Sequence, residues 1–128
     1  MAKRCTLLMD SDVHGPPSWP VALEVVRSEG SLVSASIFIA EGTGFTMDTD
    51  WGKRLQELGI EPKVVPAKEA SIELCAEAMR LVMEEDVNVV CLAVKEDDFA
   101  TLSQKLRTAG NTAGKQFSIL EIGSLGDS

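Results

Sequence analysis

Five largely apolar stretches with the length of strands recur along the chain, at residues 5–9, 34–40, 62–65, 87–94 and 117–122. The longest, residues 87–94, is interrupted only by Asn88 and is rich in β-branched side chains. A run of this kind predicts a strand whose two faces are both covered by other parts of the protein. The pattern therefore predicts a sheet that is buried on both sides.

Segments with helical spacing of apolar residues lie between these strands, at residues 18–29, 50–58, 71–84 and 98–109. Within residues 71–84, apolar positions recur three and four residues apart, which is typical of a helix with one buried face. The residues expected to cap the first three helices are Ser18, Thr49 or Asp50, and Ser71. The residues expected to end the first, second and fourth helices are Gly30, Gly59 and Gly110.

Strands and helices alternate strictly and are joined by short connections, which predicts a parallel sheet with helices on both faces. The expected fold is an α/β three-layer α-β-α sandwich with a central, mainly parallel five-stranded sheet. We assume the strand order 3-2-1-4-5, which the sequence does not itself determine. In such sheets, ligands bind beyond the carboxyl ends of the strands where the strand order reverses, here between the first and fourth strands.

Acidic residues follow both of the strands that flank this reversal. Asp10 and Asp12 come at the end of strand 5–9, and Glu96, Asp97 and Asp98 come after strand 87–94. Carboxylates gathered at one edge of a sheet repel one another, and a divalent cation is the usual compensation. The pattern favours a cation site at this edge, although Asp98 is also suited to cap the fourth helix.

Composition limits the classes of function. The 128 residues suffice for one domain, to which we assign residues 1–123, with residues 124–128 as a flexible C-terminal tail. No apolar stretch is long enough to span a bilayer and no signal peptide is recognised, so we expect a soluble, cytoplasmic protein. The formal net charge of −8 opposes non-specific binding of nucleic acid but not a nuclease site, which is itself acidic.

Cysteine, histidine and tryptophan form no recognisable catalytic motif. The cysteines, which are far apart and fall within apolar patterns, are Cys5, Cys75 and Cys91. We expect them to be reduced core thiols, and we expect no structural zinc site. His14 is expected to be a surface loop residue. Trp19 and Trp51 are expected to pack at the starts of helices, with stacking on a nucleic-acid base as the alternative.

Three short motifs carry a resemblance to a known family. Residues 10–13 read Asp-Ser-Asp-Val, residues 71–74 read Ser-Ile-Glu-Leu and residues 94–99 read Val-Lys-Glu-Asp-Asp-Phe. In order and spacing they resemble the NYN domain, a branch of the PIN-like nuclease superfamily, over residues 6–122. The corresponding family patterns are Asp-x-Asp-Asn, Asp-Ile-Ala-Leu with a second acid six residues on, and Ser-Gly-Asp-Ser-Asp-Phe. Leu102, Leu106 and Gly110 also fall where the family has L-x-x-x-L-x-x-x-G.

The resemblance implies a PIN-like fold and metal-dependent cleavage of RNA. It implies that Asp10, Asp98 and Glu96 are catalytic and that these residues, together with Asp12 and Glu77, bind Mg²⁺ or Mn²⁺. For Glu77 an ion pair on a solvated helix face is an open alternative.

Several positions depart from the family pattern. The first acid of the third helix is Ser71 here, and the Asn of the first motif is Val13. The Gly before the acids of the fourth strand is Lys95, and the first of these acids is Glu96, which is one methylene longer than aspartate. Because a metal site needs its ligands held closely in place, these departures predict a partly degraded acidic site.

Three hypotheses about function remain open. The first is a ribonuclease that depends on Mg²⁺ or Mn²⁺. The second is a non-catalytic NYN module that binds RNA, a protein partner or a second copy of itself, motivated by the changed positions and the acidic charge. The third is a haloacid-dehalogenase-like phosphatase, because residues 10–13 also resemble the nucleophile motif of that family. The Ser or Thr expected after its second strand is not evident, since Ala40 and Glu41 occur there.

Overall fold

The computed structural model describes residues 3–13, 15–66, 68–84 and 87–122. His14 and the expected tail, residues 124–128, lie outside the described residues, so the predictions for them are not tested. None of the helices in the described part of the chain is long and apolar enough to cross a membrane.

Within the described residues, five parallel strands form one sheet in the order β3-β2-β1-β4-β5, which confirms the α/β class and the assumed strand order. The strands are β1 (Arg4–Asp10), β2 (Ser31–Ala40), β3 (Glu61–Val65), β4 (Val89–Ala93) and β5 (Ser118–Glu121). β1 lies at the centre and pairs with β2 on one side and β4 on the other. Every residue of β1 after Arg4 is buried.

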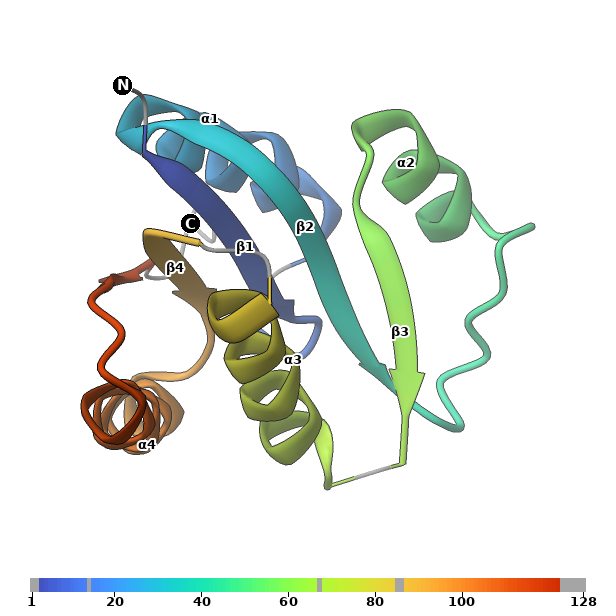
Figure 1. Ribbon diagram of the computed structural model, residues 1–128. Helices are drawn as coiled ribbons and strands as arrows, with labels where there is room; N and C mark the ends of the chain where they lie inside the picture. Colours follow the sequence, from blue (N-terminus) through green and yellow to red (C-terminus); the bar gives the residue numbers. More distant parts are fainter. Residues whose placement is uncertain (1–2, 14, 67, 85–86, 123–128) are drawn as a thin grey trace.

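Helices cover both faces of this sheet (Figure 1). They are α1 (Trp19–Glu29), α2 (Asp50–Leu58), α3 (Ala70–Glu84) and α4 (Glu96–Ala113), and a short 3₁₀ helix, η1 (Pro16–Ser18), precedes α1. α1 and α2 pack with Leu7 and Cys91 on one face, and α3 and α4 pack with Leu8 and Leu92 on the other. Successive residues of β1 and β4 thus alternate between two cores, which explains why their sequences are apolar without interruption.

Trp19 and Trp51 pack against each other at the starts of α1 and α2, as expected. Their rings meet edge to face, with centroids 5.3 Å apart and an interplanar angle of 86°. Thr49 caps α2 as predicted, because its side chain accepts a hydrogen bond from the backbone N–H of Gly52 at 3.2 Å. The tryptophan contact joins the two helices that cover the same face of the sheet.

The beginnings of α3 and α4 differ from the predicted ones. α4 begins at Glu96 with Lys95 at the N-cap, so Asp98 lies within the first turn and does not cap the helix. Three acids in this turn place negative charge at the positive end of the helix dipole, which stabilises an earlier start. α3 likewise begins at Ala70, so Ser71 is a residue of its first turn and not its N-cap.

α4 also continues beyond Gly110, the residue that was predicted to end it. The helix is capped at Gly114, whose left-handed backbone (φ 72°) suits glycine. Gly110 is buried, and a Cβ atom there would lie 2.6 Å from the ring of Phe117 and 3.3 Å from the carbonyl oxygen of Lys115. Glycine at position 110 therefore leaves room for the ring of Phe117 and does not mark the end of the helix.

All three cysteines are free thiols. Cys5 and Cys91 are buried in the core beneath α1 and α2, and burial raises the pKa of the Cys91 thiol to about 12. Cys75 on α3 is half-buried. The prediction of core thiols is thus confirmed for Cys5 and Cys91 and only partly for Cys75.

We predict that Gly110→Ala destabilises the protein by about 1–3 kcal/mol, although alanine is normally the better helix former by about 1 kcal/mol. The reason is overlap between the new methyl group and the ring of Phe117. Chemical denaturation would measure the change in the free energy of unfolding. In a Phe117→Ala background the same substitution should cost less, and an equal cost in both backgrounds would contradict this explanation.

Candidate functional site

The carboxyl ends of β1 and β4 lie side by side, at the point where the strand order reverses. β1 ends at Asp10, and β4 leads through Val94 and Lys95 into the first turn of α4. The start of α3 reaches the same edge, because Ser71 and Asp98 line one cleft. The convergence of these three elements makes this edge of the sheet the candidate site.

Asp10 is the buried acid of this site, with only 7% of its surface exposed. Its carboxylate accepts a hydrogen bond from the backbone N–H of Asp12 at 2.9 Å. Burial raises the pKa of Asp10 and the negative charges of Asp12 and Asp98 raise it further, whereas the hydrogen bond and the positive charge of Lys95 lower it. The ionised form of Asp10 is therefore unfavourable by itself, and a nearby cation would stabilise it.

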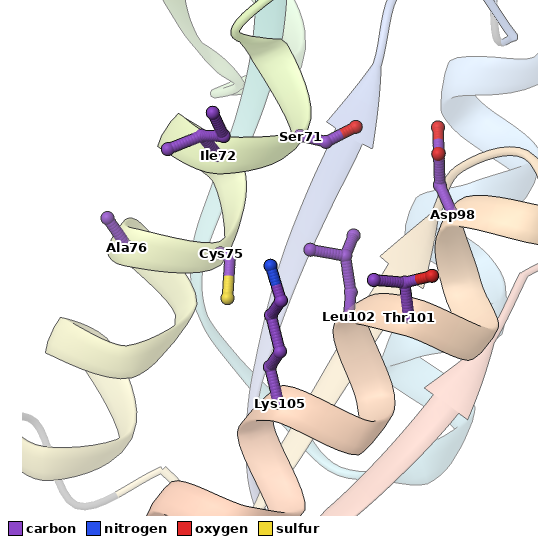
Figure 2. Close-up of a pocket in the computed structure, with 8 residues that line it drawn as sticks. All are labelled: Ser71, Ile72, Cys75, Ala76, Asp98, Thr101, Leu102 and Lys105. Carbon is purple, nitrogen blue, oxygen red and sulfur yellow. The ribbon is translucent and has the colours of Figure 1, made fainter.

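A cleft of about 340 Å³ lies between α3 and α4 and reaches Asp98 (Figure 2). Ser71 and Asp98 stand at one end of it, and the Ser71 hydroxyl is directed toward the side of α4. The ammonium group of Lys105 reaches into the space between the helices, near Cys75. The cleft therefore offers a hydroxyl, a carboxylate and an ammonium group, and its other lining residues are Ile72, Ala76, Thr101 and Leu102.

Two of the predicted acids lie at the surface of this edge. Glu96 is exposed at the first position of α4 and does not line the cleft that Asp98 lines. Asp12 is also exposed, and it lines a different hollow that extends to the start of α2. The structure thus brings the charges of Asp10, Asp12 and Asp98 close enough to interact and leaves Glu96 on the surface of the helix.

Glu77 lies apart from these acids. Its carboxylate accepts two hydrogen bonds from Arg80, at 3.0 and 2.7 Å, and Nζ of Lys63 is 3.8 Å away. The hydrogen bond from Arg80 and the charge of Lys63 lower the pKa of Glu77, against a smaller opposing effect of burial. All three residues line a hollow of about 350 Å³ beside β3. The geometry therefore corresponds to the ion-pair alternative for Glu77.

A metal ion held by the protein alone needs several ligands close together. Within the described residues, no three His, Cys, Asp or Glu side chains gather closely enough to hold one. The five ligands that the family resemblance implies therefore do not form one group. Mg²⁺ commonly binds through one or two carboxylates and takes its other ligands from water and substrate phosphates. Asp10 and Asp98, whose charges interact, fit a cation that is held in that way.

Lys105 lines the cleft and is a candidate phosphate-binding residue that the sequence patterns did not single out. It follows Asp98 by seven positions, so the two side chains share one face of α4. The seven-residue spacing from Asp98 is therefore a sequence signal that could have pointed to Lys105. Which face of α4 meets α3, however, is decided by the packing of the two helices.

We predict that Asp10→Asn stabilises the metal-free protein at pH 7. The pKa of Asp10 is raised above its ordinary value of 3.8, so the folded protein binds the proton more tightly than the unfolded chain does. Stability therefore falls as the pH rises through the raised pKa. Asparagine removes this penalty and can still accept the hydrogen bond from Asp12. Urea unfolding should show a gain for the variant at pH 7 that disappears below pH 3.8, and a loss at pH 7 would contradict the prediction.

Glu77→Gln should lower the free energy of unfolding by about 0.5–1 kcal/mol at pH 7, the usual size of a partly exposed ion pair. Because the pKa of Glu77 is lowered, this contribution is present above its ordinary value of 4.5 and is lost as the pH falls through the lowered pKa. Calorimetry should find Mn²⁺ binding unchanged in the variant. Loss of Mn²⁺ binding would show instead that Glu77 is a ligand.

Comparison with known proteins identifies the family. The family model of the NYN domain matches residues 17–116. That range contains the start of α3 and all of α4, whereas Asp10 and Asp12 lie before it. No match was found among curated proteins or among solved structures. Because the family model covers most of the sequence, and because the five-stranded parallel sheet agrees with it, the chain belongs to the NYN domain family of the PIN-like nuclease superfamily.

Proposed function

We propose that this NYN domain binds RNA and cleaves it with a divalent cation held by Asp10 and Asp98. NYN domains act on RNA. The observation that carries the proposal is the position of Asp10, which is buried at the end of the central strand beside the charges of Asp12 and Asp98. A buried carboxylate with other carboxylates around it is stabilised by a bound cation.

Mg²⁺ or Mn²⁺ suits such a site, because both ions prefer carboxylate, water and phosphate oxygens. When bound, a cation of this kind supplies positive charge for the attacked phosphate and lowers the pKa of a coordinated water. With two carboxylates as its protein ligands, the cation should bind weakly to the free protein and more tightly when RNA phosphates contribute ligands.

Lys105 and Lys95 are suited to hold the RNA backbone. Lys105 reaches into the cleft that ends at Asp98, and Lys95 lies close enough to Asp10 to lower the pKa of that carboxyl group. The hydroxyl groups of Ser71 and Thr101 line the same cleft and can donate hydrogen bonds to phosphate oxygens. These groups supply local attraction in a chain of net charge −8, so RNA binding should involve few phosphates and depend only moderately on salt.

Two observations favour a second candidate, an NYN module that binds RNA without cleaving it. Ser71 stands in the cleft where the family pattern has an aspartate, so a hydroxyl replaces one carboxylate. Glu77 is bound to Arg80, lies beside Lys63 and lines a different hollow from Asp98. Both features reduce the acidic ligands of the centre and leave the groups that contact phosphate in place.

Membership of the NYN family leaves the phosphatase hypothesis without support. We also propose a cytoplasmic location. It accords with the free thiols of all three cysteines, because a reducing compartment keeps such thiols unpaired.

RNA cleavage should require Mn²⁺ or Mg²⁺ and should fall by about two orders of magnitude in Asp98→Asn. Asp97→Asn is the matched control, because Asp97 is exposed in the same helical turn and does not line the cleft. Gel assays on single-stranded RNA with added cation or with EDTA would measure cleavage. Calorimetry would measure Mn²⁺ binding with and without an RNA that cannot be cleaved.

The possible results of these assays distinguish between the two candidate functions. RNA binding by the wild type without cleavage at any cation concentration would favour the second candidate. Equal cleavage by the wild type and Asp98→Asn would contradict the assigned cation site. Absence of RNA binding, with or without cation, would contradict both candidates.

A further inference from the structure

A second hollow, of about 340 Å³, lies where the carboxyl ends of β1 and β2 meet the start of α2. Its walls include Asp12, Ile39, Thr43, Phe45 and Trp51. Thr43 and Phe45 belong to the long connection between β2 and α2, which runs along the outer side of β3 in Figure 1. Asp12 aside, none of these side chains has a role in the cation site.

The hollow is built into the fold. The hydroxyl of Thr49 donates a hydrogen bond to the carbonyl oxygen of Thr46 at 2.6 Å, which fixes the end of the loop at the start of α2. Trp51 packs edge to face on Trp19, which is fully buried. Phe45 packs against the core beneath α1 and α2 while remaining half-buried. The aromatic walls are therefore held in place before any ligand arrives.

The lining matches the chemistry of a nucleobase. Phe45 and Trp51 offer aromatic surface and Ile39 offers aliphatic surface, which together suit the stacking of a flat ring. Asp12 is exposed and adds carboxylate oxygens that accept hydrogen bonds. Unpaired bases carry N–H donors on their Watson–Crick edges and are recognised by proteins through this combination of stacking and hydrogen bonds.

We propose that this hollow binds one unpaired base of an RNA strand, which stacks on Phe45 and Trp51 and donates an N–H group to Asp12. The inference rests on the proposed action on RNA. It adds a binding site for a base, in this hollow, to the proposed phosphate site at Asp10 and Asp98. The two are adjacent, because the backbone N–H of Asp12 donates to the carboxylate of Asp10 at 2.9 Å. A strand bound across this edge places a base in the hollow and a neighbouring phosphate near Asp10.

A lysine beside Trp51 is suited to the backbone of the stacked nucleotide. Trp51 also lines a neighbouring hollow whose charged lining residues are Lys53, Arg54 and the acids Asp50 and Glu57. Arg54 pairs with Glu57 at 3.5 Å, whereas Lys53 is exposed and makes no ion pair within the described residues. Lys53 is therefore the cation that a phosphate next to the stacked base would meet.

Phe45→Leu tests the stacking, because leucine keeps an apolar side chain against the core and removes the aromatic ring. Met47→Leu is the matched control, since Met47 belongs to the same loop, is 41% exposed and does not line the hollow. Fluorescence anisotropy would measure the binding of short single-stranded RNAs in EDTA, where no cation contributes. We expect about tenfold weaker binding for Phe45→Leu and unchanged binding for Met47→Leu, with melting temperatures recorded to check folding.

The outcomes separate this inference from the proposed function. Equal RNA affinity of the wild type and Phe45→Leu would overturn the base site and leave the action on RNA intact. If the wild type binds no RNA in EDTA, free nucleoside monophosphates test the hollow directly. They should shift the indole N–H NMR signal of Trp51, which is identified by its loss in Trp51→Phe. No shift at millimolar nucleotide would overturn the base site.

Discussion

Pairing of the central strand on both sides is the constraint on which the rest of the structure depends. β1 is paired with β2 from Arg4 to Asp10 and with β4 from Cys5 to Met9. Its side chains alternate between two apolar cores, so a shift of one residue would exchange the contents of both cores. The first charged side chain after the buried residues 5–9 of β1 is Asp10. The fold therefore holds the carboxylate of Asp10 in a fixed position at the carboxyl edge of the sheet, largely out of contact with water.

The acids at the start of α4 contribute to the helix and to the site together. Glu96, Asp97 and Asp98 all occupy the first turn, where the helix dipole favours negative charge. Of the three, Asp98 is the one that lines the cleft and whose charge acts on Asp10. The three acids that follow β4 are thus explained in part by their stabilising effect on α4. The site itself rests on the geometry of Asp98 and not on the number of acids.

Two recesses of different chemistry each have an acid whose charge acts on Asp10, Asp98 in one and Asp12 in the other. The cleft between α3 and α4 holds an ammonium group and hydroxyl groups suited to phosphate, and the hollow near α2 holds aromatic side chains suited to a base. The proposed binding of RNA therefore includes contacts that do not require a cation. Ser71 stands in the first of these recesses where the family pattern has an acid, so the recess has one carboxylate fewer while its hydroxyl and ammonium groups are retained.

The sequence by itself determined the presence and order of the strands and helices, although not every helix boundary, and it pointed to the two acids of the proposed site. Apolar runs and helical spacing are local signals, and Asp10 and Asp98 are conspicuous because each follows a buried strand. The strand order had to be assumed, since parallel pairing joins segments far apart in the chain. The sequence also could not predict that Gly110 packs against the ring of Phe117 or that Lys63 of β3 approaches Glu77. Nor could it predict the recesses lined by Lys105 and by Phe45. Each depends on how surfaces of different elements meet, and only tertiary packing decides which faces those are.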